Sequence, residues 1–219
     1  MNNRSSAATA PKVQQLELRT LNLDSTILLW INGHHTEWLD TIMWWTSHPA
    51  TWLPLYIILM VFIAVRFRSW KAALCIILGF IVAVGLSDIL CSGVLKPLVC
   101  RLRPTHEPAL DPVRLINGYT GGLYGFCSSH AANTAAVATL FSLLSRNKIA
   151  TAVLVAWVAL NCYSRMYLGA HYPTDIVVGL PIGTLLSASV YWGLRRWVLP
   201  SAEPHSPRED GEVAPPGDS

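Results

Sequence analysis

The sequence predicts an all-α protein, a polytopic membrane bundle of five to six transmembrane helices with an N-terminal amphipathic helix at the membrane interface. Of its 219 residues, 52% are hydrophobic and 13% are charged, which lies outside the usual composition of soluble proteins. The apolar residues are clustered into runs of roughly the length that crosses a bilayer. The net charge of +3 is small and forms no basic patch, so nucleic-acid binding is not supported.

Three parts follow from the distribution of polar residues along the chain. Residues 1–20 are polar and lack a period, so we expect a loosely ordered, flexible leader, and no cleavable signal peptide is evident. Residues 21–199 hold the apolar runs and form the expected membrane-embedded domain. Residues 200–219 are rich in proline, glycine and mixed charges, and we expect a disordered tail because they cannot bury a core.

The first element of the domain is expected at residues 24–46, where apolar and polar residues are interleaved. This pattern favours one amphipathic helix, or two helices broken at Gly33. Tryptophans at 30, 38, 44 and 45 favour a position at the membrane interface, where an indole ring is half apolar and half wet. The alternative, a first true span that is unusually polar, stays open at this stage.

Five spans are then expected, four without any charged residue and one broken only by Asp88. Basic clusters follow the first, third and fifth span, so alternation of the spans puts all three clusters on one side, which the positive-inside rule makes cytoplasmic. Loops 96–130 and 164–175 then share the outer face. The expected spans are residues 49–65, 72–95, 131–145, 149–164 and 176–194.

The five cysteines show neither a metal-ligand spacing nor a disulfide framework. Cys100 and Cys127 both fall in the outer loops and could pair if that side is oxidising, which the sequence leaves open.

The first polar stretch on the outer face is basic. Lys96, Arg101 and Arg103 stand where positive charge should be scarce. Snorkelling of helix-end cations explains them if they are taken alone, whereas a bound anion explains the excess of charge, and phosphate is the leading candidate. For Arg101 a phosphate contact and a lipid-headgroup contact are equally plausible.

The second stretch is Cys127-Ser128-Ser129-His130, directly before a helix of small residues. A helix N-terminus offers free backbone N–H groups and positive dipole, so this stretch can cradle an anion, although ordinary N-capping by a serine also explains it.

The third stretch, residues 164–175, carries Arg165, His171 and Asp175 between two long apolar runs. Such a polar group is costly next to a membrane, so it is a functional-site candidate. A histidine with a nearby carboxylate can act as a nucleophile or base, and an adjacent arginine supplies donors for an oxyanion.

Together the three stretches resemble the type 2 phosphatidic acid phosphatase superfamily, whose pattern is Lys-x6-Arg-Pro, then Pro-Ser-Gly-His, then Ser-Arg-x5-His-x3-Asp. The first and third motifs match in full. In the second, Cys127 replaces proline and Ser129 replaces glycine, while Ser128 and His130 are kept. The resemblance covers about residues 50–198 and identifies residues 21–199 as an acid phosphatase domain.

The resemblance implies a role for each motif residue. His171 is expected to be the nucleophile that forms a phosphohistidine, Asp175 to orient it, and His130 to protonate the leaving oxygen and then activate water. No metal or cofactor is expected, because fixed cations and helix amides already neutralise the transferring phosphoryl group. The expected phosphate-binding residues are Lys96, Arg103, Ser128, Ser129 and Arg165.

The implied substrate is a lipid phosphate or diphosphate in the bilayer of a bacterial inner membrane, with the active site facing the periplasm or exterior and no identifiable protein partner. Lipid A phosphate is favoured over undecaprenyl diphosphate, phosphatidylglycerol phosphate and phosphatidic acid, because residues 96–129 are expected to form a broad mouth for a sugar headgroup. A non-enzymatic anion transporter is the alternative from another class, although it does not need a nucleophilic histidine, its carboxylate and an acid histidine together.

Overall fold

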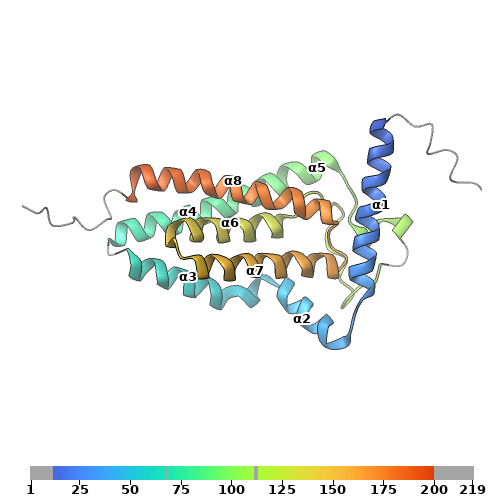
Figure 1. The fold of residues 1–219 in the computed structure, drawn as a ribbon, viewed down its shortest axis with the longest axis horizontal. Coiled ribbons are helices and arrows are strands. Elements are labelled where there is room, and N and C mark those ends of the chain that lie inside the picture. Colours follow the sequence, from blue (N-terminus) through green and yellow to red (C-terminus); the bar gives the residue numbers. More distant parts are fainter. Residues whose placement is uncertain (1–11, 68, 111–112, 200–219) are drawn as a thin grey trace, which may run out of the picture.

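Five helices run side by side and form the bundle of this protein (Figure 1). The computed structural model describes residues 12–67, 69–110 and 113–199. The predicted all-α architecture is confirmed, since the one β contact in these residues is an isolated bridge between Leu102 and Tyr124. The bundle helices are α3 (Leu53–Arg66), α4 (Trp70–Asp88), α6 (Ser129–Ser145), α7 (Lys148–Tyr167) and α8 (Pro173–Trp197). The other elements are α1 (Lys12–Gly33), α2 (Glu37–Ser47), η2 (Pro49–Trp52), η3 (Ile89–Leu95), α5 (Lys96–Val99), η4 (Pro104–His106) and η5 (Pro108–Leu110).

Four segments are long and apolar enough to cross a membrane. They carry most of their apolar side chains outward, because between 11% and 33% of each hydrophobic window is buried. This distribution suits a bilayer, where lipid and protein interior are equally apolar. The segments are Pro49–Arg66, Trp70–Val99, Lys148–Tyr167 and Pro173–Trp197.

The remaining expected span, residues 131–145, lies in α6, which is 17 residues long and is enclosed by α4, α7 and α8. Its buried face consists of small residues, with Ala131, Ala132 and Ala136 almost fully buried. Small residues let neighbouring backbones approach closely, which is the usual way that membrane helices pack. Helix α6 is therefore the centre of the bundle, and the elements around it position the polar loops.

Helices α6 and α8 meet at two glycines of α8. A β-carbon at Gly183 would lie 1.9 Å from the carbonyl oxygen of Ala132, and one at Gly179 would lie 2.5 Å from the carbonyl oxygen of Ser128. Neither position can hold a side chain unless the helices move apart. The α6–α8 spacing therefore depends on these two glycines.

The N-terminal helix α1 lies across one end of the bundle instead of running along it (Figure 1). Two helices broken at Gly33, one of the two expected arrangements, are present, since α1 ends at Gly33 and α2 begins at Glu37. Helix α1 begins at Lys12, so residues 12–20 of the expected leader belong to it. The remaining leader residues, 1–11, and the expected disordered tail lie outside the described residues.

The three basic clusters lie at the opposite end of the bundle from α1. Arg66 ends α3, Arg146 ends α6, and Arg195 lies in the last turn of α8. The loops that carry the three polar stretches are all at the α1 end (Figure 1). The structure thus separates the basic loops from the polar stretches, as the alternation of spans predicts.

We predict that Gly183→Ala destabilises the bundle by roughly 3 kcal/mol or more, because overpacking against a backbone atom cannot be relieved by a rotamer change. Gly193→Ala in the same helix is the matched control, since a β-carbon there has no neighbour within 4 Å, and alanine favours a helix. Thermal unfolding of the purified protein in detergent measures both. Equal midpoints for the two variants would contradict the close α6–α8 contact.

Candidate active site

The three polar stretches of the sequence come together at the α1 end of the bundle. Lys96 is in α5, Arg103 is in the following loop, and His130 is in the first turn of α6. Arg165 is in the last turn of α7 and His171 is in the short loop before α8. Residues from five separate segments therefore face one region, which the order of motifs along the chain does not by itself require.

The imidazole of His171 is buried and lies between a carboxylate and a guanidinium. Its Nδ1 is 3.4 Å from Oδ2 of Asp175, and its Nε2 is 3.5 Å from Nη1 of Arg103. Arg103 can only donate, so Nε2 accepts and the proton belongs on Nδ1, facing Asp175. This tautomer presents the Nε2 lone pair to the site, as a nucleophile requires.

The charge around His171 favours its neutral form. Burial lowers the pKa of His171 well below its usual range, and the cations Arg165, Arg103 and Lys96 lower that pKa further. The environment therefore favours the neutral imidazole, which is the form that can act as a nucleophile.

Asp175 is fully buried and is held by several donors at once. Its Oδ2 accepts a hydrogen bond from the backbone N–H of Tyr172, the N-cap residue of α8, at 3.0 Å. Its Oδ1 accepts one from Arg101 at 3.1 Å. The N–H of Ser128 donates to the carbonyl oxygen of Asp175 at 3.0 Å, which links the second polar stretch to the third. Asp175 is thus fixed by both its backbone and its carboxylate.

Two arginines of the site are buried and held by oxygens from other segments. Arg103 donates to the carbonyl oxygens of Tyr124 at 3.2 Å and Ala170 at 3.3 Å. Arg165 donates to Oγ of Ser47 and, at 2.8 Å, to the hydroxyl of Tyr119. The Nε of Arg165 is buried without a hydrogen-bond partner among the described residues, so a donor remains for an anion.

The ammonium of Lys96 is fixed by two hydroxyls. It lies 3.1 Å from Oγ of Ser92 and 3.1 Å from Oγ of Ser129. Ser129 stands where the family pattern has glycine, and its side chain here connects the first polar stretch to the second. The substitution thus adds a hydrogen bond without blocking the helix N-terminus.

The N-terminus of α6 contributes backbone donors. Ser128 is the N-cap, and its Oγ accepts from the N–H of Ala131 at 3.4 Å. The N–H groups in the first turn of a helix have no intrahelical acceptor and carry the positive end of the dipole. His130 lies beside them, and its ring makes no hydrogen bond to any residue that the structure describes. This imidazole is available to exchange a proton.

A small cavity of about 140 Å³ leads to these groups, and we call it the entrance cavity. Of the stretch 96–129, from which a broad mouth is expected, Tyr119 lines this cavity. That stretch folds back on itself, since the N–H of Arg103 donates to the carbonyl oxygen of Leu123, Thr105 donates to that of Thr120, and positive-φ glycines at 118 and 121 turn the chain. The entrance cavity is lined by Trp44, Ser47, His48, Pro49, Tyr119, His130, Arg165 and Leu168.

Arg101 has a different role from the two considered in the sequence analysis. Its guanidinium lies between Asp24 of α1, at 2.7 Å, and Asp175, at 3.1 Å, and is centred 3.9 Å from the ring of Tyr172. Thr174 donates its backbone N–H to Asp24 as well. Arg101 therefore holds the carboxylate that faces His171, and α1 takes part in that support.

Sequence reasoning missed Asp24, Ser47 and Tyr119 as parts of the site. Asp24 pairs with residues 77 and 150 positions away, and Ser47 meets Arg165 across 118 positions. No local spacing signals such contacts.

The disulfide considered between Cys100 and Cys127 is absent, since both are free thiols. The Sγ of Cys127 instead lies 2.9 Å from the Sγ of Cys91, which is also a free thiol.

The PAP2 superfamily model matches residues 72–198 of this chain. Lipid A 4'-phosphatase of Bacteroides thetaiotaomicron is 37% identical over 164 residues, covering 74% of this chain and 72% of that protein. Lipid A 4'-phosphatase of Porphyromonas gingivalis is 34% identical over 190 residues, covering 84% and 80%.

Two crystal structures share the fold. LpxE of Aquifex aeolicus aligns with a TM-score of 0.55 at 23% identity, covering 75% of this chain and 92% of that one. The transmembrane PAP2-type phosphatidylglycerolphosphate phosphatase of Bacillus subtilis aligns with a TM-score of 0.61 at 23% identity, covering 88% and 90%. At this identity the likeness concerns the fold.

We predict that Arg101→Gln lowers kcat by at least roughly tenfold, about 1.4 kcal/mol, and shifts the pH dependence. Without Arg101 the charge of Asp175 is less compensated, so the imidazolium of His171 gains stability and its pKa rises. The acidic limb of the kcat/KM profile should then move to higher pH, because His171 becomes protonated earlier as the pH falls. Phosphate release measured across pH for both proteins tests this.

Arg101→Lys is the matched control, since it keeps the charge while losing the forked geometry. It should leave the acidic limb near its original position even where kcat falls. If the acidic limb of the kcat/KM profile does not move in Arg101→Gln, Arg101 contributes only to packing.

Proposed function

This chain belongs to the PAP2 superfamily, and we propose that it hydrolyses the phosphate ester of lipid A at the membrane surface through a phosphohistidine on His171. It is a multi-pass membrane protein and a lipid phosphatase. The observation that carries the proposed chemistry is the position of His171, with Nδ1 facing Asp175 and Nε2 facing the guanidinium of Arg103. The relatives that are 34–37% identical support lipid A as the substrate.

In the first step, Nε2 of His171 attacks phosphorus and the bond from phosphorus to the lipid oxygen breaks. His130 gives its proton to that oxygen, so the lipid leaves as an alcohol. Asp175 accepts the Nδ1 proton in a hydrogen bond and stabilises the positive ring that results. The proton stays on Nδ1, as the tautomer argument requires.

In the second step, His130 takes a proton from water, whose oxygen attacks the phosphohistidine. The phosphorus–nitrogen bond breaks, inorganic phosphate leaves, and both histidines return to their starting states. Charge on the equatorial oxygens is stabilised by groups that are already in place and need no rearrangement. These groups are Lys96, Arg103, Arg165 and the α6 N-terminus at Ser128 and Ser129.

We further propose that the site faces the periplasm from the inner membrane of a bacterium. The basic clusters at the opposite end of the bundle support this orientation, because positively charged loops stay in the cytoplasm. An amphipathic α1 across the site end suits the membrane interface. A lipid can then place its headgroup in the site while its chains remain in the bilayer.

Covalent labelling tests the nucleophile. Protein incubated with lipid carrying radioactive phosphate and quenched in alkaline detergent should retain label, because phosphohistidine is labile in acid. His171→Ala should lose the label and all turnover, whereas His130→Ala should keep label while turnover falls by roughly 10²-fold or more. His35→Ala, at an exposed position in the loop before α2, is the control and should match the parent. Label on His171→Ala equal to that on the parent would falsify the assignment.

A substrate panel tests the lipid. Lipid A, undecaprenyl diphosphate, phosphatidylglycerol phosphate and phosphatidic acid are offered at equal surface concentration, and released phosphate is measured. We expect kcat/KM for lipid A to exceed that for undecaprenyl diphosphate by tenfold or more, about 1.4 kcal/mol of discrimination. A higher kcat/KM for undecaprenyl diphosphate would overturn the assignment of lipid A as the substrate and leave the phosphatase chemistry in place. No release from any lipid would favour an anion transporter instead.

A further inference from the structure

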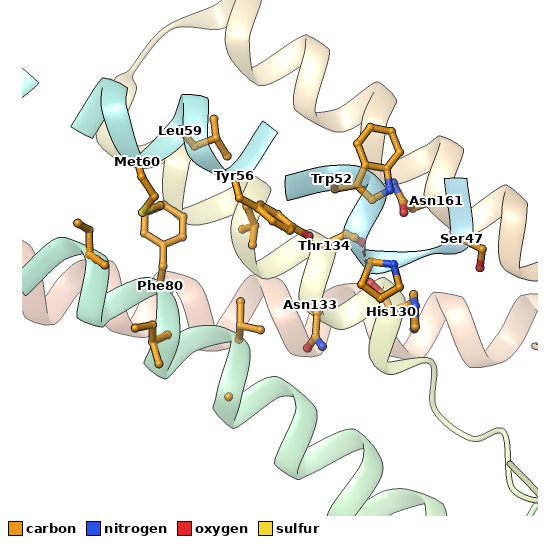
Figure 2. Close-up of a pocket in the computed structure, with 16 residues that line it drawn as sticks. Ser47, Trp52, Tyr56, Leu59, Met60, Phe80, His130, Asn133, Thr134 and Asn161 are labelled. Atoms are coloured by element: carbon orange, nitrogen blue, oxygen red, sulfur yellow. Dashed lines mark hydrogen bonds between the residues drawn. The ribbon is translucent and has the colours of Figure 1, made fainter. Parts of the chain in front are cut away.

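A large cavity begins at His130 and runs into the bundle, and we call it the chain cavity (Figure 2). Its volume is about 550 Å³, within the range of sites that bind small molecules. On α6 it extends from His130 to Val137, a distance of about 10 Å at 1.5 Å per residue. The proton-exchanging histidine of the proposed reaction therefore lies at one end of this cavity.

The walls of the chain cavity are mainly apolar. They come from α3 and α4, both within candidate membrane spans, and from α6. Such a lining suits a hydrocarbon chain and no charged group. The apolar residues that line it include Trp52, Tyr56, Leu59, Met60, Phe80 and Val84.

One group inside the chain cavity does not fit a purely apolar occupant. Asn133 lies three residues after His130 on the same face of α6, about 4.5 Å along the axis. Its Oδ1 is buried without a partner, and its carboxamide makes no hydrogen bond within the described part of the chain. A buried carbonyl oxygen left without a partner costs roughly 1–3 kcal/mol.

Two other polar side chains of the cavity, unlike Asn133, have a hydrogen-bond partner. Thr134 donates its hydroxyl to the carbonyl oxygen of His130 at 2.8 Å, and Asn161 donates to the carbonyl oxygen of Trp157 at 2.9 Å. Figure 2 shows Asn133 beside His130 among the cavity-lining side chains. The unsatisfied carboxamide is thus positioned to meet whatever enters the cavity just beyond the reacting phosphate.

We propose that Asn133 is a specificity residue that binds a hydroxyl or amide group on an acyl chain, within the first few atoms from the headgroup. This inference rests on the proposed function, since the chain must belong to the lipid whose phosphate is cleaved. A carboxamide both donates and accepts, so its best partner is a group that does the same, as hydroxyls and amides do. A plain hydrocarbon chain leaves Asn133 unpaired and is disfavoured.

The test compares two lipid phosphates of equal chain length, one with a 3-hydroxyacyl chain and one with the unsubstituted acyl chain. A third lipid, with an amide-linked chain, separates the two kinds of group. Purified full-length protein in detergent should turn over the hydroxylated or the amide-linked lipid with about tenfold higher kcat/KM than the plain one. This ratio is about 1.4 kcal/mol.

Asn133→Leu should bring that ratio close to one, because leucine has a similar volume and no hydrogen-bonding group. Val137→Ala is the matched control on the same face of α6, and it should change all three lipids alike and keep the ratio. Thermal unfolding of each variant identifies loss of fold.

The outcomes separate the role of Asn133 from the phosphatase function. Equal turnover of all three lipids by the parent protein overturns the role of Asn133 and leaves the phosphatase assignment intact, whatever the variants do. A ratio that survives in a folded Asn133→Leu protein also overturns it. Absence of phosphate release from every lipid contradicts the proposed function itself.

Discussion

The close contact between α6 and α8 is the constraint on which the rest of this structure depends. Gly179 and Gly183 bring the backbone of α8 against the carbonyl oxygens of α6, which no other residue type allows at this distance. At the same end, the N–H of Ser128 donates to the carbonyl oxygen of Asp175. The start of α6 and the start of α8 are therefore fixed together, and with them His130 and His171.

Charge in the site is arranged around this fixed point. Asp175 is the carboxylate that faces His171, and Arg101 and the N–H of Tyr172 already neutralise much of its charge. Lys96, Arg103 and Arg165 then lack a carboxylate partner among the described residues. Such an excess of buried positive charge is unfavourable until an anion arrives, so a phosphate gains affinity from relieving it.

The two cavities suit the two parts of a lipid phosphate, its headgroup and its apolar chain. The entrance cavity contains Arg165 and His130, and the chain cavity continues from His130 between α3, α4 and α6. A phosphate and an apolar chain of one molecule can thus be held on either side of the same histidine. The bond to be broken then lies where the proton must be delivered.

The sequence by itself predicted the all-α membrane architecture and the polar residues that the structure gathers at one end of the bundle, because both predictions depend on local patterns. Apolar runs of membrane length identify spans directly, and Lys96, Arg103, His130, Arg165, His171 and Asp175 follow from three motifs at fixed spacing. Even the family replacement at Ser129 could be read from the sequence, although its hydrogen bond to Lys96 could not.

Only the tertiary structure decided which distant residues support those motifs. Asp24, Ser47 and Tyr119 reach the site across 46 to 150 positions of chain, and the entrance cavity is lined by residues from α2, the loops and the helix ends. The unpaired carboxamide of Asn133 is also invisible in a sequence, where it reads as one more polar residue in a helix of small ones. Periodicity reports which face of a helix is apolar, whereas pairing and cavity shape depend on how helices far apart in the chain pack together.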